Sequence, residues 1–248
     1  EILRCIVGSE MCIRDRDKEV LHDINITLPK NSLTALVGPS GSGKSTVMKL
    51  CARFYDPQKG CIFFNGVPMN EINPESLMSH ISMVFQDVYL FQDTIRNNIR
   101  FGKTDATEEE IIAAAKKACC HDFIMRLPKG YDTLVGEGGC TLSGGEKQRI
   151  SIARAMLKDA QIILLDEATA SLDPENEVEV QKAIDTLIKG HTVIAIAHRL
   201  KTIKGADQII VLDNGQIKEK GTHETLMQAE GLYAQLWNIQ EQISGWKL

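Results

Sequence analysis

The sequence contains no long hydrophobic run. Its longest unbroken apolar stretches, such as residues 162–165 and 193–197, are far shorter than the roughly 20 residues that a membrane-spanning helix needs. No basic start followed by an apolar core marks a signal peptide. Positive charge is not in excess either, because the formal net charge is −5. We therefore expect no membrane-spanning segment and no broad electrostatic binding to nucleic acid or anionic lipid.

Cysteine and histidine occur without the spacing of a metal site. The 7 cysteines form no C-x-x-C pair, and none of the 6 histidines lies four residues from another. We expect free thiols and no structural metal ion. With 43% hydrophobic and 25% charged residues, the composition excludes a disordered, collagen-like or disulfide-scaffold chain. A length of 248 residues fits one large domain or two modest ones.

Residues 1–16 differ from the rest of the chain, since they show neither strand alternation nor a helical stripe. We expect a non-native or disordered segment here and a folded domain over residues 17–248.

From Val20 onward, the patterns predict an α/β fold. Short apolar strands at 33–37, 162–165 and 192–196 are each followed by helical patterns, which is typical of a mostly parallel sheet covered on both faces. Asn214-Gly215 predicts a tight hairpin near the end of the sheet. Residues 87–158 are mostly helical without strand partners and predict an inserted helical subdomain, and the tail from 222 to 243 is expected to be helical.

The segment Gly38-Pro-Ser-Gly-Ser-Gly-Lys-Ser45 fits the phosphate-loop pattern G-x-x-x-x-G-K-[ST] between a strand and a helix. Its glycines let backbone N–H groups surround a polyphosphate, and the helix N-terminus adds partial positive charge. Lys44 suits the β- and γ-phosphates, and the Ser45 hydroxyl suits Mg²⁺. The candidate nucleotide-binding residues here are Gly38, Ser40, Gly41, Ser42, Gly43, Lys44, Ser45 and Thr46.

Two adjacent carboxylates follow the apolar strand at 162–165. The carboxyl ends of parallel strands are where ligands bind in open α/β sheets. Phosphoryl transfer to water needs one carboxylate to hold the metal and another group to orient the water. Asp166 suits the first role and Glu167 the second.

A second glycine-containing turn, Leu142-Ser-Gly-Gly-Glu146, opens a helix predicted to run to about Lys158. Ser143 and Glu146 form a capping box, as Thr107 and Glu110 do earlier. A lone capping box is structural, but paired glycines weaken a helix unless a close backbone approach is needed. We therefore interpret this turn as a second anion-binding helix terminus.

Together these motifs resemble the ATP-binding cassette (ABC) ATPases, specifically the nucleotide-binding domain of exporter-type ABC transporters. The resemblance spans residues 20–237. Residues 142–149, which we call the signature segment, are similar to the signature sequence of the family. The resemblance implies a P-loop NTPase core with a mostly parallel sheet, an antiparallel β subdomain and an inserted helical subdomain.

Further positions are assigned by this resemblance. Gln86 matches the Q-loop glutamine, which touches Mg²⁺ and the transmembrane partner in the family. Asp173 matches the D-loop aspartate, and His198 matches the switch histidine that senses the γ-phosphate. Glu137 matches a residue of the exporter loop that contacts the coupling helices.

The resemblance further implies an ATPase that works as a head-to-tail homo- or heterodimer on the cytoplasmic face of a membrane, joined to fused or separate transmembrane domains. Each ATP, with Mg²⁺, would lie between the phosphate loop of one subunit and the signature segment of the other. Ligands of Mg²⁺ would be Ser45, Gln86 and Asp166, with Lys44, Gln86, Glu167 and His198 as the catalytic set. Residues expected to contact nucleotide from the signature segment and the D-loop are Ser143, Gly144, Gly145, Glu146 and Asp173.

One feature departs from the family pattern. The family stacks adenine on an aromatic residue that would fall near residues 13–16, yet no aromatic residue precedes Phe54. Either the guanidinium plane of Arg14 or Arg16 takes its place, or residues 1–16 do not carry the native sequence. We favour the second explanation.

The alternative function is a nucleic-acid- or ribosome-associated ABC ATPase. Chromosome-maintenance members insert a long coiled coil between the two halves of the site, whereas residues 86–143 contain short helices and no sustained heptads. Members that act on ribosomes have the pattern of two cassettes in one chain, whereas this sequence shows one cassette. The negative net charge also argues against binding to nucleic acid. We therefore expect a transport ATPase.

Overall fold

The computed structural model describes residues 3–7, 20–136, 140–166, 174–197 and 200–245. The chain divides into two compact units, the first made of Glu1–Ile81 and Thr192–Leu248 and the second of Ser82–His191. Helices in the described residues are all too short or too polar to span a bilayer.

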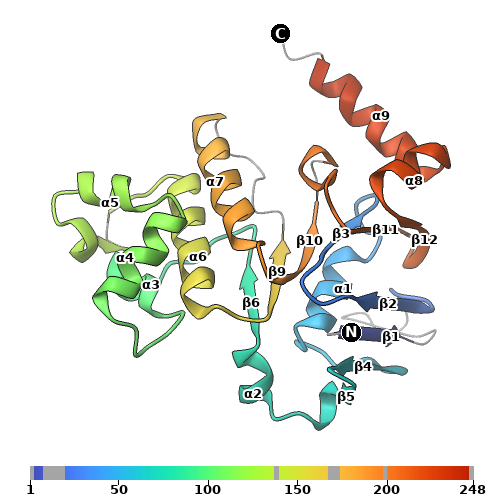
Figure 1. Cartoon of the computed structure of the whole chain (residues 1–248), viewed down its shortest axis with the longest axis horizontal. Helices are drawn as coiled ribbons and strands as arrows, with labels where there is room; N and C mark the ends of the chain where they lie inside the picture. Colours follow the sequence, from blue (N-terminus) through green and yellow to red (C-terminus); the bar gives the residue numbers. More distant parts are fainter. Residues whose placement is uncertain (1–2, 8–19, 137–139, 167–173, 198–199, 246–248) are drawn as a thin grey trace. The chain divides into compact units, whose positions relative to one another are not determined.

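The first unit contains strands of two sheets, with helices between and after them (Figure 1). Its elements are β1 Leu3–Val7, β2 Ile24–Leu28, β3 Leu33–Val37, α1 Lys44–Cys51, β4 Gly60–Phe64, β5 Val67–Pro68, the short 3₁₀ helix η1 Met69–Glu71, α2 Pro74–Ser79, β10 Thr192–Ile196, η3 Leu200–Ile203, β11 Gln208–Asp213, β12 Gln216–Gly221, α8 His223–Gln228 and α9 Leu232–Gly245.

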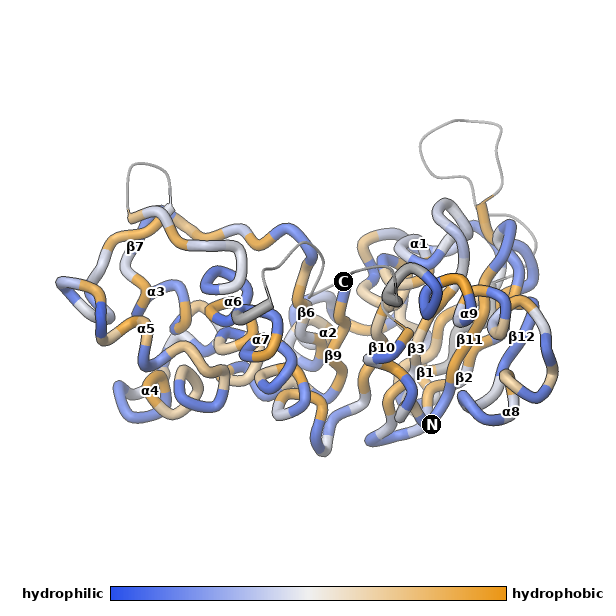
Figure 2. Tube along the Cα trace, turned by 90° about the horizontal axis from the view of Figure 1, so that it is seen from above, coloured by the Kyte–Doolittle hydropathy of each residue, from blue (hydrophilic) through white to orange (hydrophobic). Residues whose placement is uncertain are grey.

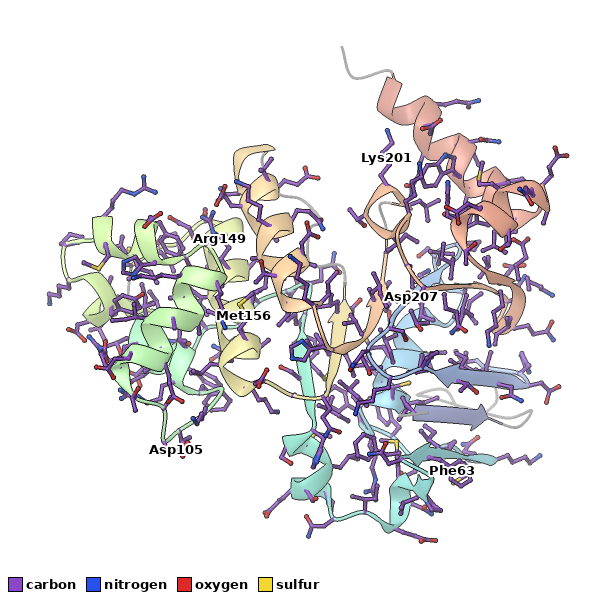
Figure 3. All side chains as sticks on the ribbon, in the orientation of Figure 1. Phe63, Asp105, Arg149, Met156, Lys201 and Asp207 are labelled. Carbon is purple, nitrogen blue, oxygen red and sulfur yellow. The ribbon has the colours of Figure 1, made fainter. Side chains whose placement is uncertain are left out.

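The larger sheet of this unit has the order β12-β11-β3-β10. β3 lies parallel to both β10 and β11, and all five residues of β10 are buried. The Asp207 carboxylate accepts a hydrogen bond from the backbone N–H of Leu33 at 2.8 Å, which fixes the start of β3 (Asp207 is labelled in Figure 3). β3 pairs with β10 on one side and β11 on the other, so both neighbours hold the strand from which the following loop begins. The prediction of a mostly parallel sheet is confirmed.

Hydrophobic residues concentrate along β3, β10 and β11, which are largely orange in Figure 2, whereas β12 is mostly polar. On one side, α8 and α9 bury Leu226, Tyr233 and Trp237 in a cluster with residues of β3 and β11. Truncating such a buried side chain costs about 2–5 kcal/mol. The predicted hairpin is also confirmed: β11 and β12 pair antiparallel, and both Asn214 and Gly215 have positive φ angles, 48° and 72°.

The second sheet of this unit is antiparallel, with the order β2-β1-β4-β5. Its strand β1 corrects only the expectation of disorder at residues 3–7, because Leu3–Val7 pairs with β2 on one side and β4 on the other. Leu3 is fully buried. The sequence does not predict this strand, because it forms by pairing with β2 and β4, which come later in the chain. The rest of 1–16 lies outside the described residues.

The second unit is mostly helical. It contains β6 Ile81–Val84 (from its second residue on), β7 Asp93–Thr94, α3 Ile95–Arg100, α4 Glu108–Lys117, α5 His121–Arg126, η2 Gly130–Asp132, β8 Leu134–Val135, α6 Gly144–Lys158, β9 Ile162–Asp166 and α7 Pro174–Leu187. The helical segment predicted at 87–158 falls inside this unit, which also takes in β9 and α7.

Both predicted capping boxes are present, at Thr107–Glu110 and Ser143–Glu146, and α6 ends at Lys158 as predicted. The tail is helical as expected, and it is divided into two helices, α8 and α9. Glu230 has a φ of 50° and separates α8 from α9. The carboxylate of Glu219 accepts the backbone N–H groups of Leu232 and Tyr233, which starts a new helix at this point.

Candidate nucleotide site

The phosphate loop (residues 38–45) joins the carboxyl end of β3 to α1, as the sequence predicts. Gly38, Gly41 and Gly43 all have positive φ angles, of 146°, 77° and 101°. Residues with a Cβ rarely adopt this conformation, so the pattern of glycines matches the backbone that the turn requires. A hydrogen bond from Ser42 N to the carbonyl oxygen of Pro39, 3.2 Å long, tightens the turn.

Two of these glycines are also required by packing. A Cβ at Gly38 would collide with the carbonyl oxygen of Leu212, at the end of β11. A Cβ at Gly43 would lie 2.6 Å from Cδ2 of Leu21. The phosphate loop is therefore seated on the end of the parallel sheet and on the segment before β2, and it is held there by residues far from it in sequence.

The N-terminus of α1 is suited to an anion. Gly43 is its N-cap and supplies no side-chain cap, and the first turn holds no acidic residue. Uncapped N–H groups at a helix N-terminus, with the partial positive charge of the helix dipole, attract phosphate. Ser40, Gly41 and Ser45 are exposed, so their polar groups are open to solvent.

Lys44 lies inside the loop, with 7% of its surface exposed. Its Nζ donates hydrogen bonds to the carbonyl oxygens of Gly38 and Pro39, at 2.9 and 2.8 Å. Ser42 Oγ lies 3.4 Å from the same nitrogen. The cation is thus held against the loop backbone, where a polyphosphate cradled by that backbone would meet it.

In the second unit, two candidate magnesium ligands share one sheet edge. β6 and β9 are neighbouring strands, and their arrows point the same way in Figure 1. Asp166 is the last residue of β9 and is half-buried, while Gln86 follows β6 by two residues and is exposed. The strand directions therefore bring a carboxylate and an amide oxygen to the same carboxyl edge.

The signature segment starts α6 through its capping box. Ser143 Oγ accepts the N–H of Glu146 at 3.3 Å, and the Glu146 carboxylate accepts the N–H of Ser143 at 2.8 Å. Ser143 and Gly144 are exposed, whereas Gly145 is buried. The capping box gives Ser143 a structural role, and its exposure leaves it open to a ligand from outside the chain.

A contact that sequence reasoning missed involves Gln148, one turn into α6. Gln148 is 3% exposed, and its Nε2 donates to the carbonyl oxygen of Phe85 at 3.3 Å. Phe85 directly precedes Gln86, so α6 holds the backbone next to this candidate magnesium ligand. The two partners are 63 residues apart, and only an unexplained glutamine within the signature segment hinted at the contact.

Comparison with known proteins decides the family. The family model described as "ABC transporter" matches residues 21–170, more than half of the chain. The chain belongs to the ABC transporter family. It is the ATPase domain of that family, of the type found in exporters.

Relatives of this ABC domain include an ATP-dependent lipid A-core flippase of Legionella pneumophila (strain Paris), 50% identical over 91% of this chain and 38% of the flippase. ATP-binding cassette sub-family B member 6 of Rattus norvegicus is 49% identical over 91% of this chain and 27% of that protein. A solved structure of a bacterial Atm1-family ABC exporter with ATP bound matches with a TM-score of 0.87 and 44% identity, covering 96% of this chain and 41% of that one. The ABC domain thus spans between about a quarter and two fifths of these relatives.

Some predicted site residues of the ABC domain lie outside the residues that the structure describes. They are Glu137, Glu167, Asp173 and His198, together with residues 13–16, where an adenine-stacking group was expected.

Proposed function

We propose that this chain binds and hydrolyses ATP to power export across a membrane, as the nucleotide-binding domain of an exporter-type ABC transporter. The observation that carries the proposal is the phosphate loop. Its three positive-φ glycines, uncapped helix N-terminus and inward-held Lys44 form an anion cradle, in a chain of the ABC family. The exporters and flippase among its relatives favour transport over a nucleic-acid- or ribosome-associated role.

Within the proposed site, Lys44 binds the β- and γ-phosphates. The hydroxyl of Ser45, the amide oxygen of Gln86 and the carboxylate of Asp166 hold Mg²⁺, and such oxygen donors suit this hard cation. Mg²⁺ would neutralise the charge that develops on the phosphates.

Two further residues complete the proposed chemistry. Glu167 orients the attacking water and accepts its proton, and His198 senses the γ-phosphate. Phosphoryl transfer needs such positioning of water, phosphates and charge more than it needs covalent chemistry.

The signature segment acts on the nucleotide of a second subunit in this proposal. One phosphate loop accounts for one triphosphate, so the second helix terminus, at Ser143–Gly145, serves the ATP of the partner in a head-to-tail homo- or heterodimer. Removing one such preorganised donor typically costs on the order of 10² to 10³ in rate. Asp173, in the segment matching the D-loop, would contribute to the same subunit contact.

Transmembrane domains, fused or separate, are the other proposed partners, contacted through the segments of Gln86 and Glu137. This arrangement places the domain on the cytoplasmic face of a membrane. Support comes from the relatives, which include a protein named as a flippase and one named as an exporter. All three extend well beyond the region that this chain matches.

The experiment is a Glu167→Gln substitution. Without a group to activate water, the variant should bind MgATP and accumulate as a dimer that hydrolyses ATP very slowly. Size-exclusion chromatography with and without MgATP, alongside phosphate release, measures both properties. A variant that stays monomeric at high protein concentration, or that hydrolyses ATP like the unsubstituted protein, would contradict the role of Glu167.

A further inference from the structure

The two glycines of the signature segment have different surroundings, although they are adjacent. Gly144 is exposed, whereas Gly145 is buried against Asn176 on α7, within the same unit. A Cβ at Gly145 would lie 2.5 Å from Cβ, 2.6 Å from Cγ and 2.8 Å from Oδ1 of Asn176. Because the Cβ of Asn176 is fixed to the α7 backbone, rotating its side chain cannot relieve this contact. A methyl group at position 145 therefore requires α6 and α7 to move apart.

The same asparagine is bonded to a buried cation one turn further along α6. Arg149 Nη2 donates to Oδ1 of Asn176 at 2.9 Å, and Arg149 is only 7% exposed (its position on α6 is labelled in Figure 3). The guanidinium carbon also lies 5.1 Å from the ring centroid of Phe123 on α5. Burial makes a charged donor depend strongly on its acceptors, so Asn176 contributes an acceptor that water cannot easily replace.

We propose that Asn176 is a positioning residue for the signature segment, and that Gly145 lacks a side chain because Asn176 of the same chain fills the space above it. The proposal rests on the function proposed above, in which Ser143–Gly145 contact the ATP of the partner subunit. α7 begins at Pro174, directly after Asp173, so Asn176 ties the signature helix to the segment that matches the D-loop. Contact between the Asn176 side chain and Gly145 sets the distance between α6 and α7. The hydrogen bond from Arg149 to Asn176 holds the two helices together.

This role predicts a separation between two binding events. The phosphate loop belongs to the other unit of the chain, so substitution of Asn176 should leave the nucleotide affinity of the monomer unchanged. The ATP-dependent dimer depends on the signature segment and should be weakened. A purely structural effect on folding would not separate the two.

The test is a double-mutant cycle between positions 145 and 176 in the Glu167→Gln background, with the dissociation constant of the MgATP-bound dimer measured by sedimentation equilibrium. Asn176→Gly should raise this constant about tenfold, as expected for losing a hydrogen bond to a charged group. Gly145→Ala should raise it further. Gly145→Ala combined with Asn176→Gly should be no worse than Asn176→Gly alone, because the glycine at 176 vacates the space that the methyl group needs.

Two matched variants and one binding assay complete the design. Asn176→Asp keeps the size and the acceptor for Arg149 and should dimerise nearly as well as the parent. Asp185→Ala, at an exposed position further along α7, should behave as the parent. Binding of a fluorescent ATP analogue at protein concentrations too low for dimerisation should give the same affinity for all variants.

Two results would overturn the inference. If the effects of Gly145→Ala and Asn176→Gly simply add, the space over Gly145 is reserved for the partner's nucleotide and not for Asn176. If Asn176→Gly dimerises like Asp185→Ala, Asn176 positions nothing. Failure of the Glu167→Gln parent to dimerise with MgATP would instead contradict the role of Glu167 and, with it, the proposed function on which the positioning role rests. In that case the same cycle in thermal unfolding midpoints still decides whether Asn176 occupies the space above Gly145.

Discussion

The ammonium group of Lys44 donates to the carbonyl oxygen of Gly38 at 2.9 Å, so the first residue of α1 is bonded back to the residue that follows β3. The backbone of the phosphate loop thereby closes around its own lysine. A polyphosphate would offer this buried cation an anionic acceptor in place of neutral carbonyl oxygens, and such charge-assisted hydrogen bonds are about twice as strong.

Lys44→Ala should therefore weaken ATP binding by about tenfold to a hundredfold, the loss expected for a hydrogen bond between charged partners. It should also abolish nucleotide-dependent dimerisation. Titration with a fluorescent ATP analogue measures the first effect and size-exclusion chromatography the second. Lys49→Ala is the matched control, because Lys49 is exposed on the same helix. Equal affinities for the two variants would contradict the role of Lys44.

Glu219→Ala should destabilise the first unit, since the Glu219 carboxylate accepts the N–H groups of Leu232 and Tyr233 at the start of α9. Loss of a helix N-cap costs about 0.5–2 kcal/mol, and the first turn also loses a favourable negative charge. Urea unfolding followed by tryptophan fluorescence reports on this end of the molecule, because Trp237 lies on α9. Glu241→Ala, exposed on the same helix, should unfold like the unsubstituted protein.

Glu110 should make folding sensitive to acid. Its hydrogen bond from Lys103 and the backbone N–H of Thr107 lower the pKa of its carboxyl below the usual 4.5. A lowered pKa in the folded state means that the carboxylate stabilises the fold above pH 4.5, and that this contribution is lost as the pH falls through the folded pKa. The stability difference between the unsubstituted protein and Glu110→Gln should be present at pH 7 and shrink below pH 4.5. A difference that is independent of pH would rule out this role.

The cysteines should differ sharply in reactivity. Burial raises the pKa of the Cys120 thiol to about 12, whereas Cys140 is exposed. Because only the thiolate is nucleophilic, iodoacetamide at pH 8 should modify Cys140 at least about a hundredfold faster than Cys120. Peptide mass spectrometry over time measures both rates, and in urea both cysteines should react. Fast modification of Cys120 without denaturant would contradict its burial.

The parts of the site that could be predicted from sequence are those built from local interactions. The phosphate loop depends on glycines within one turn, and the start of α6 depends on Ser143 and Glu146, three residues apart. The hairpin at Asn214-Gly215 depends on two positive-φ positions. Partners this close in the chain leave a recognisable spacing in the sequence.

Other parts could not be predicted, because their partners are distant in the chain. The residues around Leu3–Val7 show no pattern that predicts a strand, because β1 forms by pairing with β2 and β4. The sequence gives no role for Gln148, because its hydrogen-bond acceptor, the carbonyl oxygen of Phe85, is 63 residues away in the chain.

The sequence by itself determined the family, the phosphate loop and the caps that begin the helices, because each is set by residues within a few positions of one another. Only the tertiary structure decided that Leu3–Val7 belongs to a sheet and that Gly145 is covered by Asn176. It also decided that Glu219 starts a second helix in the tail. Each of these depends on which distant segments meet, and that is fixed by the packing of the whole unit and not by any local pattern.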